Sequence, residues 1–100
     1  MQPVDLDEAR VLIHSARERL YDIDHPTETV IVCTIQRKDK DRRIAALQKA
    51  AAMTDLTLRF RYRTDAQPLT DVTYAALSTH EDPTDEEVDA AIKVYHESLP

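Results

Sequence analysis

The chain has 100 residues, which is the usual size of one domain and too short for two hydrophobic cores. It contains no glycine, which excludes the glycine-rich phosphate loop, the dinucleotide-binding fingerprint and the nucleophile elbow. Its single cysteine excludes a disulfide framework, and its formal net charge of −6 marks an acidic protein.

Neither a targeting segment nor a membrane span is evident in the sequence. The segment from Met1 to Asp7 carries acidic residues and no basic apolar run, so it does not resemble a secretory signal. No apolar run approaches the length of a transmembrane helix. Cys33 lies inside an apolar run and is expected to be a small buried side chain in a reducing compartment. These features predict a cytoplasmic protein without a membrane partner.

The first predicted element is a helix from about Leu6 to about Tyr21. Asp5 stands three residues before Glu8, which is the spacing of an N-terminal capping box. The helix is expected to end before Pro26, because the residue preceding a proline is pushed out of the helical region. Its apolar residues recur at helical spacing on one face: Leu6, Ala9, Leu12, Ile13, Ala16, Leu20 and Ile23.

The segment from Val30 to Ile35 is almost continuously apolar and rich in β-branched residues. This composition predicts a strand that is covered on both faces. The charged run from Arg37 to Arg43 is expected to be a loop, with Asp39 or Asp41 as the N-cap of the next helix. The apolar face of that second helix is formed by Ile44, Ala46, Leu47, Ala50 and Ala51.

The stretch from Leu56 to Arg63 shows the clearest alternation in the chain. Since successive strand side chains point to opposite faces, one face is expected on the core and the other in solvent. Thr64 to Thr70 is predicted to be a turn longer than two residues, and Asp71 to Ser78 a third strand. The apolar set is Leu56, Leu58, Phe60 and Tyr62, and the polar set is Thr57, Arg59, Arg61 and Arg63.

The last predicted element is a helix that begins after Pro83. Thr84 and Glu87 have the spacing of a capping box, and acidic residues fill the first turn, where the helix dipole favours them. The apolar face of this helix is formed by Val88, Ala91, Ile92 and Tyr95.

The element order α-β-α-β-β-α predicts a single α+β domain over residues 1–100, with a three-stranded sheet and three helices. Its last five elements match a ferredoxin-like unit that lacks its final strand, preceded by an extra helix. In that layout the third strand lies between the other two. The alternative places the first two strands side by side and parallel, with the hairpin outside. The predicted core consists of Leu12, Ile13, Ala16, Leu20, Val30, Val32, Ile44, Leu47, Leu58, Phe60, Tyr74, Ile92 and Tyr95.

Charge is segregated along the chain. Residues 1–36 carry a net −4, residues 37–63 a net +6 and residues 64–100 a net −8. Two interpretations follow: the acidic ends pair with the basic centre, or the basic centre binds an anionic partner. Arginine at the strand positions favours forked contact with carboxylate or phosphate. The candidate partner-binding residues are Arg37, Lys38, Lys40, Arg42, Arg43, Arg59, Arg61 and Arg63.

No arrangement of residues in the sequence matches a catalytic or metal-binding motif. His14 stands one helical turn before Glu18, which predicts a surface ion pair. His80 is followed by acidic residues, but their spacing is not that of an EF-hand, so we interpret them as part of an acidic helix start. We therefore predict no catalytic residue, no metal site and no cofactor.

These observations favour a small non-catalytic interaction module that binds a protein partner through charged surfaces, such as an adaptor or an inhibitor carried by phages or mobile elements. The first alternative is binding to the nucleic-acid backbone through residues 37–63, although the outward strand positions offer no aromatic side chain for base stacking. The second alternative is an enzyme whose site forms only in three dimensions. A homodimer is also predicted, because the Val30 to Ile35 strand would lie at a sheet edge.

Overall fold

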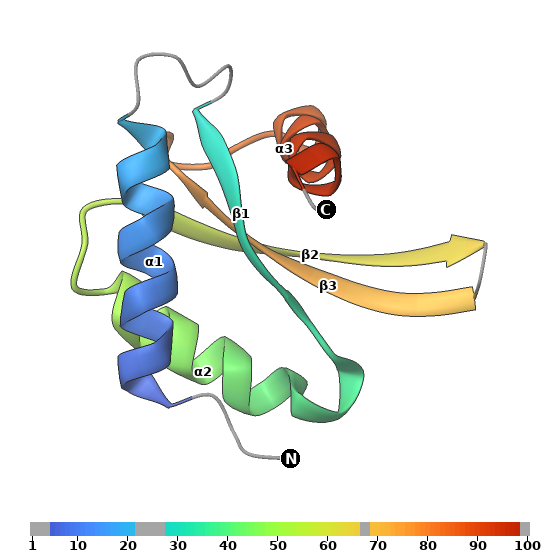
Figure 1. Cartoon of the computed structure of the whole chain (residues 1–100), viewed down its shortest axis with the longest axis horizontal. Coiled ribbons are helices and arrows are strands. Elements are labelled where there is room, and N and C mark those ends of the chain that lie inside the picture. Colours follow the sequence, from blue (N-terminus) through green and yellow to red (C-terminus); the bar gives the residue numbers. More distant parts are fainter. Residues whose placement is uncertain (1–4, 22–27, 67–68, 99–100) are drawn as a thin grey trace.

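The structure is a computed structural model that describes residues 5–21, 28–66 and 69–98, with the backbone alone described for residues 63–66 and 69–71. Within these ranges, none of the helices combines the length and the apolarity that crossing a membrane requires. The elements in chain order are α1 (Leu6–Leu20), β1 (Thr29–Ile35), the 3-10 helix η1 (Arg37–Asp39), α2 (Lys40–Ala51), β2 (Thr57–Ala66), β3 (Leu69–Ser78) and α3 (Asp85–Ser98), as Figure 1 shows.

The three strands form one sheet in the order β1-β3-β2, and both neighbouring pairs are antiparallel. β1 and β2 are therefore parallel to each other, with α2 in the connection between them. The predicted α+β class, the element order and the central position of the third strand are confirmed. The alternative with β1 beside β2 is wrong. The arrangement is compatible with a ferredoxin-like unit that lacks its last strand.

The sheet is covered on both faces, which makes three layers (Figure 1). α1 and α2 pack on one face over the larger hydrophobic cluster, which includes Ile13, Leu47 and Leu77. α3 packs on the other face over a smaller cluster, which includes Ile31 and Ile92. Two-sided coverage explains the nearly continuous apolar sequence of β1, as predicted, although β1 is an edge strand.

A β-bulge in β1 turns additional apolar side chains toward the larger cluster. Ile31 pairs with Ala76 and Cys33 pairs with Ala75, so Val32 is the extra residue. Strict alternation would place Val32 and Cys33 on opposite faces, but both lie in the cluster beneath α1 and α2, whereas Ile31 packs against α3. The bulge thus shifts the alternation by one residue, so the side chains after Val32 point to the opposite faces from those that regular alternation would give them.

Two of the three helix starts follow the predicted capping chemistry. The Asp5 carboxylate accepts a hydrogen bond from the Glu8 amide at 2.7 Å. Thr84 and Glu87 exchange side-chain to backbone hydrogen bonds of 3.1 Å each, which confirms the capping box. Asp39 occupies the N-cap position of α2, but its side chain makes no capping hydrogen bond, and η1 replaces the predicted loop before it.

The β2–β3 hairpin is longer than predicted. The turn expected from Thr64 to Thr70 is wrong, because β2 and β3 continue pairing until Ala66 faces Leu69. Residues 67–68 lie outside the described residues. Ladder hydrogen bonds come from the backbone and form irrespective of side-chain polarity, so polar residues in this stretch did not prevent strand formation.

The outer part of the hairpin extends past β1 as a two-stranded ribbon (Figure 1). β1 ends at Ile35, which pairs with Thr73, and beyond this pair β3 is joined to β2 alone. Tyr62 lies opposite Thr73 and is 55% exposed, although its place in the alternation assigns it to the core face. Tyr62 therefore lies on the face of the sheet that carries α1 and α2, but it is not buried, because the ribbon extends beyond these helices at this point.

The predicted core is confirmed. Seven of its members are buried and the others are half-buried against the two clusters. Cys33 is buried as predicted, and burial raises the pKa of its thiol. The buried members are Ile13, Ala16, Val30, Val32, Leu47, Tyr74 and Ile92, and the half-buried members are Leu12, Leu20, Ile44, Leu58, Phe60 and Tyr95.

Candidate functional site

The predicted partner-binding residues lie on two different faces of the sheet. Arg59 and Arg61 pair with residues of the smaller cluster, so their side chains extend toward α3. The side chain of Arg63 lies outside the described residues. The remaining cations lie on η1 and the first turn of α2: Arg37, Lys38, Lys40, Arg42 and Arg43.

Arg59 and Arg61 are engaged by the start of α3. Arg59 donates from Nη1 to the Pro83 carbonyl and from Nη2 to Asp85 Oδ1. Arg61 Nη1 lies 2.7 Å from the same Asp85 oxygen, and Arg61 Nε lies 3.2 Å from Asp89 Oδ1. For these two arginines, the interpretation that the acidic C-terminal part neutralises the basic centre describes the structure.

This ion network also affects the acidity of its central carboxylate. Hydrogen bonds from Arg59 and then Arg61 hold the pKa of Asp85 below its ordinary value of 3.8. Asp85 therefore stays ionised at neutral pH and connects β2 to the N-terminus of α3. The Arg59 and Arg61 side chains are only 32% and 25% exposed, so most of their surface is already covered within the chain.

The cations on η1 and α2 form a more open surface, which we call the α2 basic surface and define as Arg37, Lys38, Lys40 and Arg42. Three of these residues are exposed and Lys40 is half-buried. The ammonium group of Lys40 lies 5.3 Å from the ring centroid of Tyr62, within the range of a cation–π contact. The surface thus combines several cations with one exposed aromatic ring.

The α2 basic surface is electrostatically unfavourable for the isolated chain. The N-terminus of a helix carries partial positive charge, so each cation in or near the first turn costs about 0.3–1 kcal/mol at low salt. Among the described residues, no ion pair joins Lys38, Lys40 or Arg42 to a carboxylate. Asp39 and Asp41 stand among these cations and offset part of their charge, but the run from Arg37 to Arg42 keeps an excess of positive charge that an anionic partner would neutralise.

Tyr62 was missed as a surface residue because alternation alone assigned it to the core. The length of the β2–β3 hairpin relative to β1 is the signal that would have identified it. Tyr62 pairs with Thr73, at the last position that β1 reaches. Strand periodicity thus gives the face on which a side chain lies, whereas the extent of the neighbouring strand decides its exposure.

The start of α3 and the loop before it are acidic. His80 Nε2 lies 2.5 Å from Glu28 Oε2 and 3.4 Å from Glu87 Oε2. Within the described part of the chain, no group of three or more histidine, cysteine, aspartate or glutamate side chains is arranged to hold a metal ion. The predicted pair of His14 and Glu18 is present, with 3.2 Å between Nε2 and Oε1.

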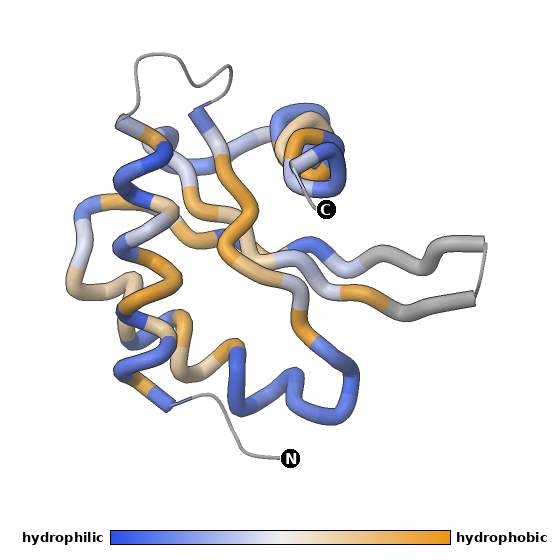
Figure 2. The backbone as a smooth tube through the Cα atoms, in the orientation of Figure 1, coloured by the Kyte–Doolittle hydropathy of each residue, from blue (hydrophilic) through white to orange (hydrophobic). Residues whose placement is uncertain are grey.

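Hydropathy follows the same division of the molecule. In Figure 2, hydrophobic residues run along β1 and the inner side of the helices, whereas η1 and the adjoining start of α2 are strongly hydrophilic. The α2 basic surface is therefore hydrophilic as well as rich in cations. No protein-family model matches the chain, and no curated protein or solved structure was found to be significantly similar to it.

Proposed function

We propose that this protein is a non-catalytic interaction module whose α2 basic surface binds an acidic surface on a protein partner. The supporting observation is that Lys38, Lys40 and Arg42, at the positive end of α2, form no ion pair with a carboxylate among the described residues. Such a surface would steer an acidic partner into contact and set its orientation. Adaptors and the small inhibitors of phages and mobile elements are the proposed functional class.

Arg59 and Arg61 have a secondary place in this proposal. Their guanidinium groups already bind Asp85 and Asp89, so a partner would have to displace these carboxylates to use them. Arg43 is also partly engaged, because its Nη1 donates to the Thr34 carbonyl at 3.5 Å. The partner is therefore expected to contact Lys38 and its neighbours first.

A protein partner is favoured over nucleic acid by the charge of the whole molecule. The net charge of −6 would oppose a long polyanion, whereas an acidic patch of limited size can dock on one face. The exposed ring of Tyr62 is one aromatic group, and single-stranded nucleic acid is usually bound by several stacked rings. Binding to the nucleic-acid backbone is the alternative, and the oligonucleotide titration below would detect it.

The test uses charge reversal with a control on the same helix. A protein partner is first isolated by affinity capture on the immobilised wild-type chain. The double variant Lys38→Glu and Arg42→Glu should then associate with this partner about 10-fold more slowly or worse, and with a weaker salt dependence. Lys49→Glu reverses an exposed charge at the far end of α2 and should change the association rate by less than about 2-fold. Equal effects of the two changes would refute the proposal.

The same variants separate the two kinds of partner. Labelled single-stranded and double-stranded oligonucleotides are titrated at about 50 and 300 mM salt. Binding at the lower salt that is lost in the Lys38→Glu, Arg42→Glu variant but kept in Lys49→Glu would favour nucleic acid over protein. If no oligonucleotide binds in this way, and the double variant binds the protein partner more weakly than the wild type does, the results support a protein-binding module.

The predicted homodimer is a separate proposal that uses the edge of β1. Arg19 donates to the Ile31 carbonyl and Arg43 donates to the Thr34 carbonyl. A second strand would use these same acceptors, so it would compete with the two arginines for them. Light scattering decides between the two states, because one chain has a mass of 11.4 kDa. A mass near one chain rejects the dimer, and a mass near two chains should fall when Ile35 is changed to Lys.

A further inference from the structure

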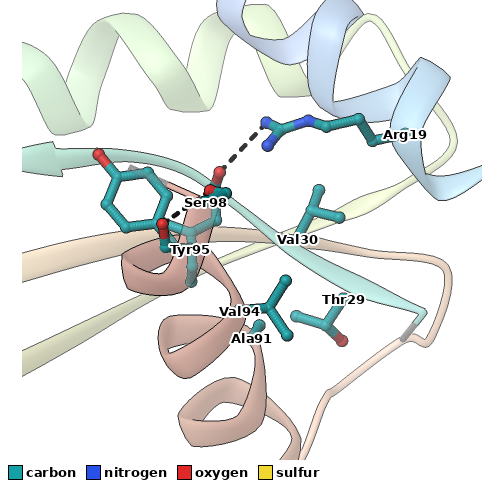
Figure 3. A pocket seen from close by; sticks show the side chains of 8 residues that line it. Arg19, Thr29, Val30, Ala91, Val94, Tyr95 and Ser98 are labelled. Carbon is teal, nitrogen blue, oxygen red and sulfur yellow. Dashed lines mark hydrogen bonds between the residues drawn. The ribbon is translucent and has the colours of Figure 1, made fainter. Parts of the chain in front are cut away.

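A cavity of about 220 Å³ lies beside the edge of β1, away from the α2 basic surface. Its walls come from β1, from the second half of α3 and from Arg19 of α1 (Figure 3). Ile31, Val94 and Tyr95 give it a largely apolar lining, and Arg19 is its charged group. An edge strand, a facing helix and a cation thus meet at one place.

The edge of β1 presents peptide groups to this cavity. β1 pairs with β3 on one side only. The Ile31 carbonyl accepts a hydrogen bond from Arg19 Nη2 at 3.3 Å, so it points away from β3. In an antiparallel pair the amide and carbonyl of one residue point to the same side, and the Ile31 amide is therefore directed outward as well. Added strands use outward pairs of this kind.

Arg19 occupies the place where a donor of an added strand would lie. Its guanidinium group makes one hydrogen bond to the strand and has further N–H donors. Among the described residues, no carboxylate forms an ion pair with Arg19. A carboxylate beside the groove would find a forked donor that is already held in position.

The size of the cavity limits what can enter it. Pockets for drug-sized ligands usually measure about 300–1,000 Å³, so this cavity suits one aliphatic side chain. Ala91 forms part of the wall and leaves room where a larger residue would fill the space. The lining and the cation together select a group that is apolar at one end and anionic at the other.

We propose that the groove between β1 and α3 binds an extended peptide of a partner protein, which adds to the edge of β1. One aliphatic side chain enters the cavity, a carbonyl of the peptide accepts a hydrogen bond from the Ile31 amide, and a carboxylate binds Arg19, which keeps its hydrogen bond to the Ile31 carbonyl. This carboxylate comes either from the C-terminus of the peptide or from an aspartate or glutamate side chain. The site is independent of the α2 basic surface.

The experiment follows the amide spectrum of the full-length ¹⁵N-labelled protein during titration with synthetic peptides. The probes are Ser-Thr-Ser-Thr-Val-Thr-Leu with a free carboxyl terminus, its C-terminal amide, and the amide with aspartate in place of the last threonine. Shifts are expected at the amides of Ile31 and Val94, with half-saturation at or below about 1 mM peptide. A tighter complex of the free acid identifies the C-terminal carboxylate, and a tighter complex of the aspartate peptide identifies the side chain.

Two variants test the assigned contacts. Arg19→Gln should weaken binding of the preferred carboxylate peptide by about 5-fold or more and leave the plain amide unchanged. Arg10→Gln removes another exposed cation of α1, outside the cavity lining, and should change affinity by less than about 2-fold. Ser98→Trp places a bulky group in the lining of the groove and should abolish binding of all three peptides.

Three results would overturn the proposal. The first is absence of shifts up to about 2 mM of any peptide. The second is a set of shifts confined to η1 and α2, which would place the peptide on the α2 basic surface. The third is broadening of the β1 and α3 amides that grows with protein concentration before any peptide is added, which would show that a second copy of the chain fills the groove.

Discussion

Replacing Ile92 with alanine tests how strongly the sheet holds α3. Ile92 is 4% exposed and lies in the smaller cluster with Ile31 and Val88, so nearly all of its side chain is out of water. Loss of its three carbon groups costs about 2.4 kcal/mol of transfer free energy, at about 0.8 kcal/mol each. The cavity left behind extends the expected loss of stability to about 2–5 kcal/mol.

The assay is urea unfolding followed by circular dichroism, combined with amide hydrogen exchange. With a slope of about 2 kcal/mol per molar urea, a loss of about 2–5 kcal/mol should lower the midpoint by about 1–2.5 M. Exchange of the α3 amides should accelerate more than exchange of the α1 amides, because the lost contacts lie under α3. Val11→Ala is the control, since Val11 is 65% exposed and its truncation should cost less than about 0.5 kcal/mol.

An Ile92→Ala variant whose free energy of unfolding lies within about 0.5 kcal/mol of the wild-type value would show that the smaller cluster does not hold α3 on the sheet. If the variant accelerates amide exchange equally in α1 and α3, α3 does not open separately from the rest of the fold. In that case the two clusters would unfold as one cooperative unit.

Three further predictions concern the N-terminal start of α3 and the buried thiol. The pKa of Asp85 is held below its ordinary value of 3.8 in the folded chain, so its pairing stabilises the fold at neutral pH and is lost as pH falls through the lowered value. Asp85→Asn should therefore destabilise the protein at pH 7, and its difference from wild type should shrink as the pH is lowered below 3.8; a difference that does not change with pH would contradict this. Thr84→Ala should cost about 1 kcal/mol and lower Tm by about 4–8 °C, because the Glu87 amide loses its acceptor; an unchanged melting curve would argue against the cap. Cys33 should react with a thiol reagent much more slowly in the native protein than in urea, since burial raises the pKa of its thiol, and rapid native labelling would contradict its burial.

The fold could be predicted from the sequence to the extent that it depends on local patterns. The predicted first helix ends within one residue of Leu20, because apolar spacing and the Asp5 cap act over only a few positions. The first strand is likewise found within one residue of its observed start at Thr29. The sequence of elements left two possible strand orders, one with the third strand in the centre and one with the first two strands side by side. The structure has the first of these, because β3 pairs with both β1 and β2.

The tertiary structure decided how the basic centre is divided. Asp85 lies 26 positions after Arg59 in the chain, and nothing in the local pattern of either segment shows that they meet. The outcome depends on which face of the sheet α3 covers, and the hydrophobic packing of the whole helix determines that face. As a result Arg59 and Arg61 are paired within the chain, whereas Lys38 and Arg42 stay on an open surface.

The tertiary structure also decided which strand side chains are exposed and on which face of the sheet each one lies. The bulge at Val32 places two successive side chains in one cluster, and the early end of β1 leaves Tyr62 exposed. Periodicity of the sequence assigns a side chain to a face, because the backbone alternates with a period of two residues. Whether that face is covered, and where the alternation reverses, depends on neighbouring strands and helices that are remote in the sequence.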